Sequence, residues 1–313
     1  MWVIPFNNDP RSTSSLCSVG ISFDPRVHPR EAEDGAAEFR SFLDQYPDVA
    51  PQFSDASAVR PWVSTGRLQY SSSNTVGDRW CLTAHAAGFV DALFSGGMQN
   101  TVAAIHNLVH RVIAAVKDDD FSRDRFAPVE RAEAGLLAHN DLLVANAYTA
   151  FESWRLWDGW FRVWEATQVL TTAVVDKAAQ DFHRSRDIST LDHLSVLEAD
   201  GGLPAYPPVH EFFRRASVIV RQVADHKQSA DAGADELLAL TKQVDFIPPV
   251  IGLADPSNQW FRVTPRRLIR TSLWRRFEAP EQIRPLFADN SARSLVLEAI
   301  RMAWSKGSEE RQD

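Results

Sequence analysis

The sequence is poor in cysteine, and Cys17 and Cys81 are the only two among 313 residues. They lie far apart and form no Cys-x-x-Cys pair, which argues against both a disulfide framework and a cysteine-based zinc site. Each fits better as a small buried apolar side chain than as a nucleophile. We therefore expect a protein of a reducing compartment, the cytoplasm, with no metal centre.

Long apolar runs and an excess of basic charge are also missing. No run approaches the roughly 18 apolar residues that a helix needs to cross a bilayer, and the first residues lack the basic and then apolar layout of a secretion signal. The 33 basic residues are outnumbered by 41 acidic ones, which argues against a surface built to hold nucleic acid. The one arginine-dense stretch, Arg262 to Arg276, is interpreted as a solvated face. We expect neither a membrane nor a nucleic-acid partner.

Two glycine-containing motifs of catalytic or binding sites are missing from the sequence. None of the 14 glycines forms a Gly-x-Gly-x-x-Gly pattern, so the strand-turn-helix that seats a dinucleotide pyrophosphate is not predicted anywhere in the chain. A Gly-x-Ser-x-Gly nucleophile elbow is missing too, which leaves hydrolase chemistry with little support.

Short strand signals come first in the chain and helical patterns come after them. Strands are expected at 2–6, 16–23, 68–71 and 79–82, the last two as a hairpin, with a helix at 31–45. A long helix is predicted next, because large apolar residues recur at helical spacing and form one stripe that ends at Asp118. The residues of this stripe are Met98, Val102, Ile105, Val109, Val112 and Val116.

The rest of the chain predicts mostly helix. Helices are expected at 136–150, 160–182 and 291–304, with breaks at Pro207-Pro208 and Pro248-Pro249. The predicted fold class is therefore α+β and helix-dominant. We expect a sheet-bearing region with its long helix over residues 1–125 and a helical region over residues 126–313.

The segment from Trp80 to Met98 reads WCLTAHAAGFVDALFSGGM. A strand ends there in small residues, and the pair Gly96-Gly97 comes directly before the long helix. Small residues let another group approach the backbone, and glycines before a helix expose N–H groups at the positive end of its dipole. Such a segment can bind an anion or the polar edge of a cofactor ring. The alternative is a tight strand-to-helix connection that binds nothing.

Two stretches resemble flavin-dependent halogenases and related FAD monooxygenases. The run from Ala86 to Gly97, AAGFVDALFSGG, resembles the halogenase motif AAGFVDPLFSxG. The opening residues Trp2 to Pro5, WVIP, resemble the end of the Trp-x-Trp-x-Ile-Pro motif of the same family. The resemblance implies an oxidoreductase that uses FAD and oxygen, a flavin reductase as partner, and an aromatic small-molecule or carrier-protein-bound substrate.

The resemblance also implies roles for individual residues. Gly96 and Gly97 match the turn whose backbone N–H groups hold the halide. Phe94 and the elements at the start of the chain match the substrate side. The implied substrate-side residues are Trp2, Ile4, Pro5 and Phe94. The implied cofactor-binding residues are His85, Ala87, Gly88, Asp91, Ser95, Gly97 and Met98.

The sequence departs from the family pattern at three places. Ala84-His85 stands where hydroxylases have Gly-Asp, so the usual carboxylate contact to the flavin is missing. Ala92 replaces a proline in the turn. Phe94 occupies the position where indole halogenases have a catalytic glutamate, which points away from free tryptophan and toward activated phenols or pyrroles.

The largest departure is that the flavin-seating glycine pattern and the catalytic lysine of the family are both missing. None of the five lysines has a matching context. We therefore expect a truncated halogenase, the carboxyl-terminal part, that binds FAD weakly or not at all and is inactive alone. The alternative is a non-catalytic helical binding or partner protein derived from such an enzyme.

Two further groups of residues favour packing roles. His106 and His110 have the i, i+4 spacing of metal ligands, but no third ligand is evident and both flank the apolar stripe. Trp157, Trp160 and Trp164 share a helix face and are expected in the core, although in a halogenase such a cluster could also wall an aromatic-substrate pocket.

Overall fold

The structure, a computed structural model, describes residues 1–9, 11–30, 32, 34–187, 190, 203, 205–259 and 264–287. It divides into two compact units, Met1–Leu68 and Gln69–Asp313, and each is described by itself. The boundary expected between residues 125 and 126 falls inside a helix of the second unit. That residues 1–125 and 126–313 have different functional roles stays a prediction. The helix expected at 291–304 lies outside the described residues.

The first unit contains a strand pair and one helix. The strands expected at 2–6 and 16–23 are present as β1 (Trp2–Pro5) and β2 (Cys17–Gly20), and the two pair antiparallel with Trp2 opposite Gly20. Helix α1 (Gly35–Asp44) begins where the Asp34 side chain accepts a hydrogen bond from the backbone N–H of Ala37 at 3.0 Å, an N-cap that satisfies one of the free donors of the first turn. A short 3₁₀ helix, η1, comes next at Ala50–Phe53.

The short strands of the second unit pair differently from the prediction. Strand β3 (Tyr70–Ser71) pairs with β6 (Gly88–Phe89), and β4 (Val76–Gly77) pairs with β5 (Trp80–Cys81), both antiparallel. The hairpin expected between 68–71 and 79–82 is therefore wrong. The chain instead reverses in the two residues after Gly77, where Arg79 has a φ of 65°, and this tighter turn leaves β3 free to pair with the later strand.

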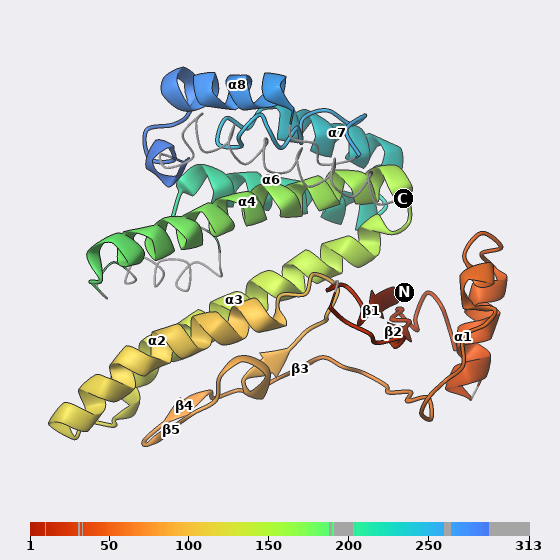
Figure 1. Ribbon diagram of the computed structural model, residues 1–313, viewed down its shortest axis with the longest axis horizontal. Helices are drawn as coiled ribbons and strands as arrows, with labels where there is room; N and C mark the ends of the chain where they lie inside the picture. Colours follow the sequence, from red (N-terminus) through yellow and green to blue (C-terminus); the bar gives the residue numbers. More distant parts are fainter. Residues whose placement is uncertain are drawn as a thin grey trace. The chain divides into compact units, whose positions relative to one another are not determined.

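Helices make up most of the second unit, and the predicted long helix is present. The helices are α2 (Gly97–Asp118), α3 (Arg123–Ala150), α4 (Trp154–Ser185), α6 (Pro207–Ala224), α7 (Ala230–Lys242) and α8 (Pro265–Leu273), followed by a π-helical turn at Trp274–Glu278 and a 3₁₀ turn at Arg284–Phe287. Helix α2 ends as predicted after Asp118, because Asp119 adopts the left-handed conformation. Helices α2 and α3 run side by side (Figure 1).

The core of the second unit is centred on α4. One face of α4 carries fully buried side chains at intervals of three and four residues, and it packs against α3, α6 and α7. These residues are Leu156, Trp160, Val163, Ala166 and Leu170. The Trp160 indole N–H donates to the Leu143 carbonyl of α3 at 3.1 Å, which satisfies the one polar atom of that ring. The helix-dominant α+β prediction is confirmed.

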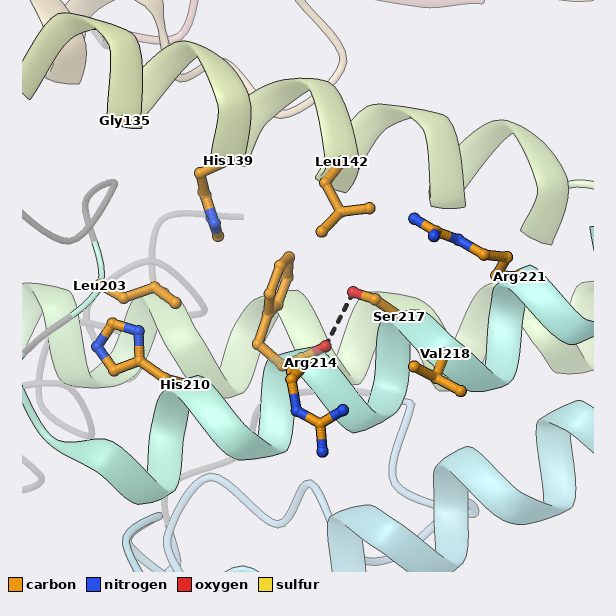
Figure 2. A pocket seen from close by; sticks show the side chains of 10 residues that line it. Gly135, His139, Leu142, Leu203, His210, Arg214, Ser217, Val218 and Arg221 are labelled. Atoms are coloured by element: carbon orange, nitrogen blue, oxygen red, sulfur yellow. Dashed lines mark hydrogen bonds between the residues drawn. The ribbon is translucent and has the colours of Figure 1, made fainter. Parts of the chain in front are cut away.

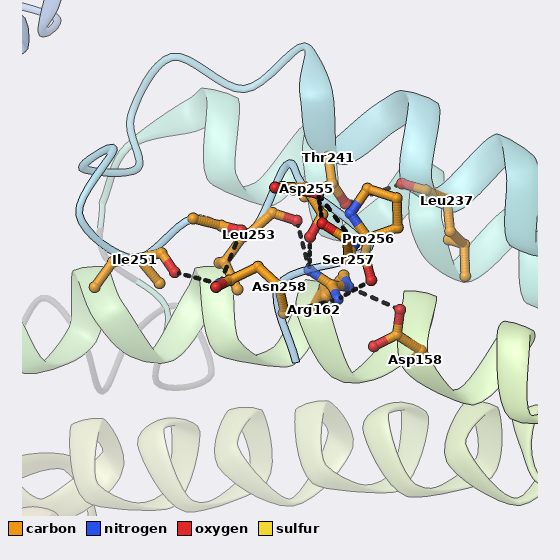
Figure 3. Close-up of polar contacts among 11 residues, drawn as sticks. Asp158, Arg162, Leu237, Thr241, Ile251, Leu253, Asp255, Pro256, Ser257 and Asn258 are labelled. Atoms are coloured by element: carbon orange, nitrogen blue, oxygen red, sulfur yellow. Dashed lines mark hydrogen bonds and ion pairs between the residues drawn. The ribbon is translucent and has the colours of Figure 1, made fainter. Parts of the chain in front are cut away.

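A buried guanidinium connects α4 to the loop that precedes α8. The Arg162 side chain is 4% exposed and pairs with Asp158 at 2.9 Å, one turn earlier on the same helix. Its remaining N–H groups donate to four backbone carbonyls of the loop, at distances of 3.0–3.4 Å (Figure 3). The acceptors belong to Leu253, Asp255, Pro256 and Asn258. One planar, permanently charged side chain therefore fixes the conformation of this loop.

Replacing this side chain tests how much the clamp contributes to stability. We expect Arg162→Met to lower the free energy of unfolding by about 3 kcal/mol, because it leaves Asp158 and the loop carbonyls without their buried donor. Urea denaturation measures the change. The matched control is Arg155→Met on the same helix, whose side chain also makes two ion pairs but is half exposed and should matter much less. Equal losses for the two variants would contradict the clamp.

Candidate functional site

The segment between β5 and α2 is tied to α3 and β3 by hydrogen bonds. The Ala84 N–H donates to the buried Glu133 carboxylate of α3 at 3.0 Å, and Ala84 has a φ of 49°. At the end of β3, the Ser72 N–H donates to the Ala87 carbonyl at 2.9 Å. The Tyr70 hydroxyl donates to the His85 carbonyl at 2.5 Å. These bonds fix the short 3₁₀ turn Ala84–Ala86, and with it the position of His85.

The turn that leads into α2 is built around Asp91. One carboxylate oxygen accepts from the Leu93 N–H at 2.8 Å, and the other accepts from the Tyr148 hydroxyl of α3 at 3.1 Å. Ser95 then donates its N–H to the Ala92 carbonyl at 2.9 Å and adopts the left-handed conformation with a φ of 54°. Both oxygens of Asp91 therefore hold the turn in place on α3, and a contact from Asp91 to a cofactor stays a prediction.

The halide turn implied by the resemblance opens directly onto the N-terminus of α2. Gly96 is the N-cap residue, and no described side chain caps the helix there. The first N–H groups of α2 therefore point outward at the positive end of a helix of 22 residues. Such a terminus attracts anions.

The His85 imidazole lies against this turn. A Cβ atom added at Gly97 would meet the His85 Cε1 at 2.8 Å and Nε2 at 3.0 Å, so the ring occupies the space that a larger residue would need. The ring is exposed and stacks on Phe89, with centroids 5.4 Å apart. The sequence identified His85 as the replacement for a carboxylate and as an implied cofactor-binding residue. The structure adds that its ring borders Gly97 of the glycine turn.

Phe94 lies in the same turn and joins it to an aromatic cluster on α4. Its ring centroid is 5.0 Å from that of Trp164 and 6.3 Å from that of Trp157. Phe161 packs on Trp164 at 5.2 Å, and Phe151 packs on Trp157 at 4.8 Å. Of the three tryptophans expected in the core, Trp160 is fully buried. Trp157 and Trp164 are partly buried and pack against the core while keeping some exposed ring surface.

Ala87 and Gly88 have packing roles that the sequence did not reveal. Ala87 is buried, and a Cβ atom at Gly88 would lie 2.7 Å from the Leu137 Cδ2 and 3.1 Å from the Tyr70 carbonyl oxygen. A larger residue at Gly88 would push the segment off α3. Met98, by contrast, is 82% exposed. Binding of FAD by these residues stays a prediction.

Trp2, Ile4 and Pro5 lie in the first unit. All three are exposed on β1, and the Trp2 ring covers Gly20 of β2, where a Cβ atom would lie 2.2 Å from the Trp2 Cζ2. Their expected position beside the flavin and the substrate stays a prediction.

A cavity of about 440 Å³ lies between α3 and α6. His139 and Leu142 of α3 face His210 and Ser217 of α6 across it (Figure 2). Burial, and then the neighbouring His210, lower the pKa of His139 to about 4. The α3 residues of this cavity lie on the opposite helical face from Glu133 and Leu137, at 100° per residue, so α3 separates the cavity from the glycine turn.

His106 and His110 remain on the surface of α2. Their ring centroids are 6.4 Å apart, and the His110 Nδ1 lies 3.1 Å from the His106 carbonyl oxygen. Within the described ranges, no group of three His, Cys, Asp or Glu side chains has the arrangement of a metal site. The described helices also include none with the length and apolar character to cross a bilayer.

No protein-family model matches the chain, but individual proteins do. It is 39% identical to the monodechloroaminopyrrolnitrin halogenase PrnC of Pseudomonas fluorescens, over 95% of this chain and 54% of the relative. It is 37% identical to the tetracycline 7-halogenase of Kitasatospora aureofaciens, over 92% and 52%. A shorter match, 25% identical over 42% of this chain and 28% of the relative, is a 1H-pyrrole-2-carbonyl-[peptidyl-carrier protein] chlorinase of P. fluorescens.

A solved structure gives the same result. The halogenase PltM in complex with phloroglucinol and FAD superposes with a TM-score of 0.77 and 34% sequence identity, over 83% of this chain and 52% of that one. The chain thus spans about half the length of the relatives it matches. Over that span it belongs to the flavin-dependent halogenases, and the resemblance of its two motifs to that family is confirmed.

The buried carboxylate that holds the glycine segment should make stability depend on pH. Burial raises the pKa of Glu133 above its ordinary value of 4.5, only partly offset by the Ala84 hydrogen bond. Because the pKa of Glu133 is higher in the folded chain than in the unfolded chain, the folded chain loses stability as the pH rises from 4.5 through the raised pKa. Glu133→Gln keeps an acceptor oxygen without the charge, so its stability relative to the natural chain should increase from about pH 4.5 to about pH 7.5.

Urea denaturation at the two pH values measures this change. Glu130→Gln, on the same helix but in a partly exposed ion pair with Arg123, controls for the loss of one negative charge. A stability difference for Glu133→Gln that is the same at both pH values would show that burial does not govern this carboxylate.

Proposed function

We propose that this chain forms the halide-binding and substrate-binding side of a flavin-dependent halogenase that acts on an electron-rich aromatic ring. The observation that carries the proposal is the turn from Asp91 to Gly97. It ends in an uncapped helix N-terminus and bears Phe94, which contacts the tryptophans of α4. An anion site and an aromatic surface are thereby joined by a few residues.

The halide side rests on Gly96, Gly97 and His85. The outward N–H groups of the first turn of α2 favour a negative ion, because they are unsatisfied and carry the positive end of the dipole. The glycines leave the backbone accessible, and the exposed imidazole beside them can donate a further hydrogen bond. In the family FAD supplies the oxidising chemistry that turns the halide into an electrophile. The residues that would border the flavin are His85, Ser95, Gly97 and Met98. The sequence has no Gly-x-Gly-x-x-Gly pattern that could hold the pyrophosphate of FAD.

The substrate side rests on the aromatic cluster. Phe94, Trp157 and Trp164 present partly exposed rings that can stack on a planar substrate and exclude water from it. Because Phe94 places no carboxylate beside the substrate, the ring must be activated by its own substituents. A phenol fits this requirement, as phloroglucinol bound to PltM does. A pyrrole on a carrier protein, the substrate named for the chlorinase relative, fits it as well. A flavin reductase would deliver the reduced flavin. We also propose that the chain works in the cytoplasm.

Binding of a phenol at the cluster is the direct test of this proposal. The chain has ten tryptophans, which can be labelled with fluorotryptophan and followed by fluorine NMR, with Trp157→Phe and Trp164→Phe to assign the two signals. We expect phloroglucinol to shift both signals. Phe94→Ala should weaken binding by roughly threefold to tenfold, the worth of one aromatic contact.

The signal of Trp274, which is buried against Phe287, serves as an internal control and should not move. Signals of Trp157 and Trp164 that stay unchanged at saturating phloroglucinol would contradict the assignment of the cluster to substrate binding.

The missing glycine pattern leads to a prediction about the cofactor. We expect this chain, incubated with FAD and passed through a desalting column, to lose the visible absorbance of flavin, because its sequence contains no Gly-x-Gly-x-x-Gly pattern to seat the pyrophosphate. Retention of one FAD per chain would contradict this and would require a dinucleotide site of another kind.

A further inference from the structure

Helix α6 turns polar side chains toward α3, at positions that apolar side chains normally fill. These residues occur at i, i+4, i+7 and i+11, which places them on one helical face. They are His210, Arg214, Ser217 and Arg221, and all four line the cavity between the two helices. The face of a helix that packs on a neighbouring helix is normally apolar. Here the two faces instead enclose a cavity of about 440 Å³ with polar groups along it.

The facing residues of α3 have the same spacing and include two unsatisfied polar groups. They are Gly135, His139, Leu142 and Asn146, and the first three line the cavity. The His139 ring packs on Phe213 with centroids 4.7 Å apart, and no described residue forms a hydrogen bond with it. Asn146 is 5% exposed, and its Nδ2 has no hydrogen-bond partner among the described residues. Since buried polar groups are normally hydrogen-bonded, both side chains have unused capacity to bind a ligand.

The charged groups of the cavity favour an anion. Its lining includes two arginines, and no described carboxylate lines it. Arg214 is paired with Glu211 at 2.7 Å, whereas Arg221 forms no ion pair with any described residue. Asp225 follows Arg221 by one turn, but it pairs with Lys227 at 2.8 Å. One permanent positive charge therefore lacks a counter-ion, and a guanidinium binds a carboxylate well because its N–H groups match the two oxygens.

The wall between the polar groups favours a planar ring. Phe213 is 5% exposed and packs on the core residue Trp160, with centroids 5.7 Å apart, so its ring is held in place. Planar rings stack well on such a surface. Figure 2 shows His210 and Arg221 at opposite ends of the cavity. They are separated by roughly 16 Å along α6, at 1.5 Å per residue, which is long enough for an aromatic ring with one charged end.

We infer that the cavity between α3 and α6 binds a small aromatic carboxylate. The carboxylate pairs with Arg221, and the ring packs on Phe213. Burial lowers the pKa of His139 to about 4, so its imidazole is neutral at pH 7 and offers the bound molecule one hydrogen-bond donor and one acceptor. The cavity and the glycine turn lie on opposite faces of α3, and the inference does not depend on the proposed function.

Fluorine NMR of para-trifluoromethylbenzoate tests the inference, with para-trifluoromethylbenzamide as a neutral probe of the same shape. We expect saturable binding of the benzoate and binding of the benzamide that is weaker by roughly tenfold, because the amide cannot pair with a guanidinium. Arg221→Met should weaken benzoate binding by a similar factor and leave benzamide binding unchanged. Arg215→Met, at an exposed arginine of α6 that does not line the cavity, is the matched control and should change neither.

The histidine side chains report where the benzoate binds. The chain has nine histidines, which can be labelled at their ring nitrogens, with His139→Gln, His210→Gln and His85→Gln to assign three signals. We expect the benzoate to shift the signals of His139 and His210 and to leave that of His85 in place. A shift of His85 alone would put the anion at the glycine turn and overturn the inference.

Three further results would also overturn it. These are no benzoate binding by the natural chain, equal binding of benzoate and benzamide, and unchanged benzoate binding by Arg221→Met. Circular dichroism establishes that the arginine variants remain folded, which we expect because both side chains are exposed.

Discussion

The second unit depends on α3, a helix that is contacted on two opposite faces. One face holds the segment before α2 through a buried carboxylate, a close packing contact and a tyrosine hydroxyl, provided by Glu133, Leu137 and Tyr148. The other side packs against α4 and α6 in the main core. The glycine turn is therefore fixed relative to the aromatic cluster of α4 because both rest on the same rigid helix. A loop that was free of α3 could not hold Phe94 against Trp164 and Gly97 against His85 at once.

Much of the architecture could be predicted because helical periodicity is a local signal. The long helix after Gly97, its end at Asp118 and the helical character of the chain beyond it all depend on residues within a few turns of one another. The pairing of the two-residue strands could not be predicted in this way. Tyr70 finds its partner at Phe89 because the intervening segment is held by Glu133, 49 residues after Ala84 in the sequence, and no local pattern reports such a contact.

The candidate site was only partly visible in the sequence for a similar reason. The order of residues from Ala86 to Gly97 identified the turn, but the packing of His85 on Gly97 and of Leu137 on Gly88 emerges only in three dimensions. Periodicity also identified the apolar stripe of α2 without its direction. A repeat of 3.6 residues shows that side chains share a face, but it does not show whether that face points into the core or away from it. The structure shows that it points away.

Chlorine NMR of chloride in the presence of the chain is the most direct test of the proposal that the turn at Gly96-Gly97 is an anion site for halide. We expect the chain to broaden the chloride line and excess bromide to reverse the broadening. Gly97→Ala should reduce the broadening, because the new methyl group enters the space that His85 occupies, whereas Gly66→Ala, where nothing lies within 4 Å, should not. Equal broadening by the natural chain and both variants would show that the glycine turn does not bind the halide.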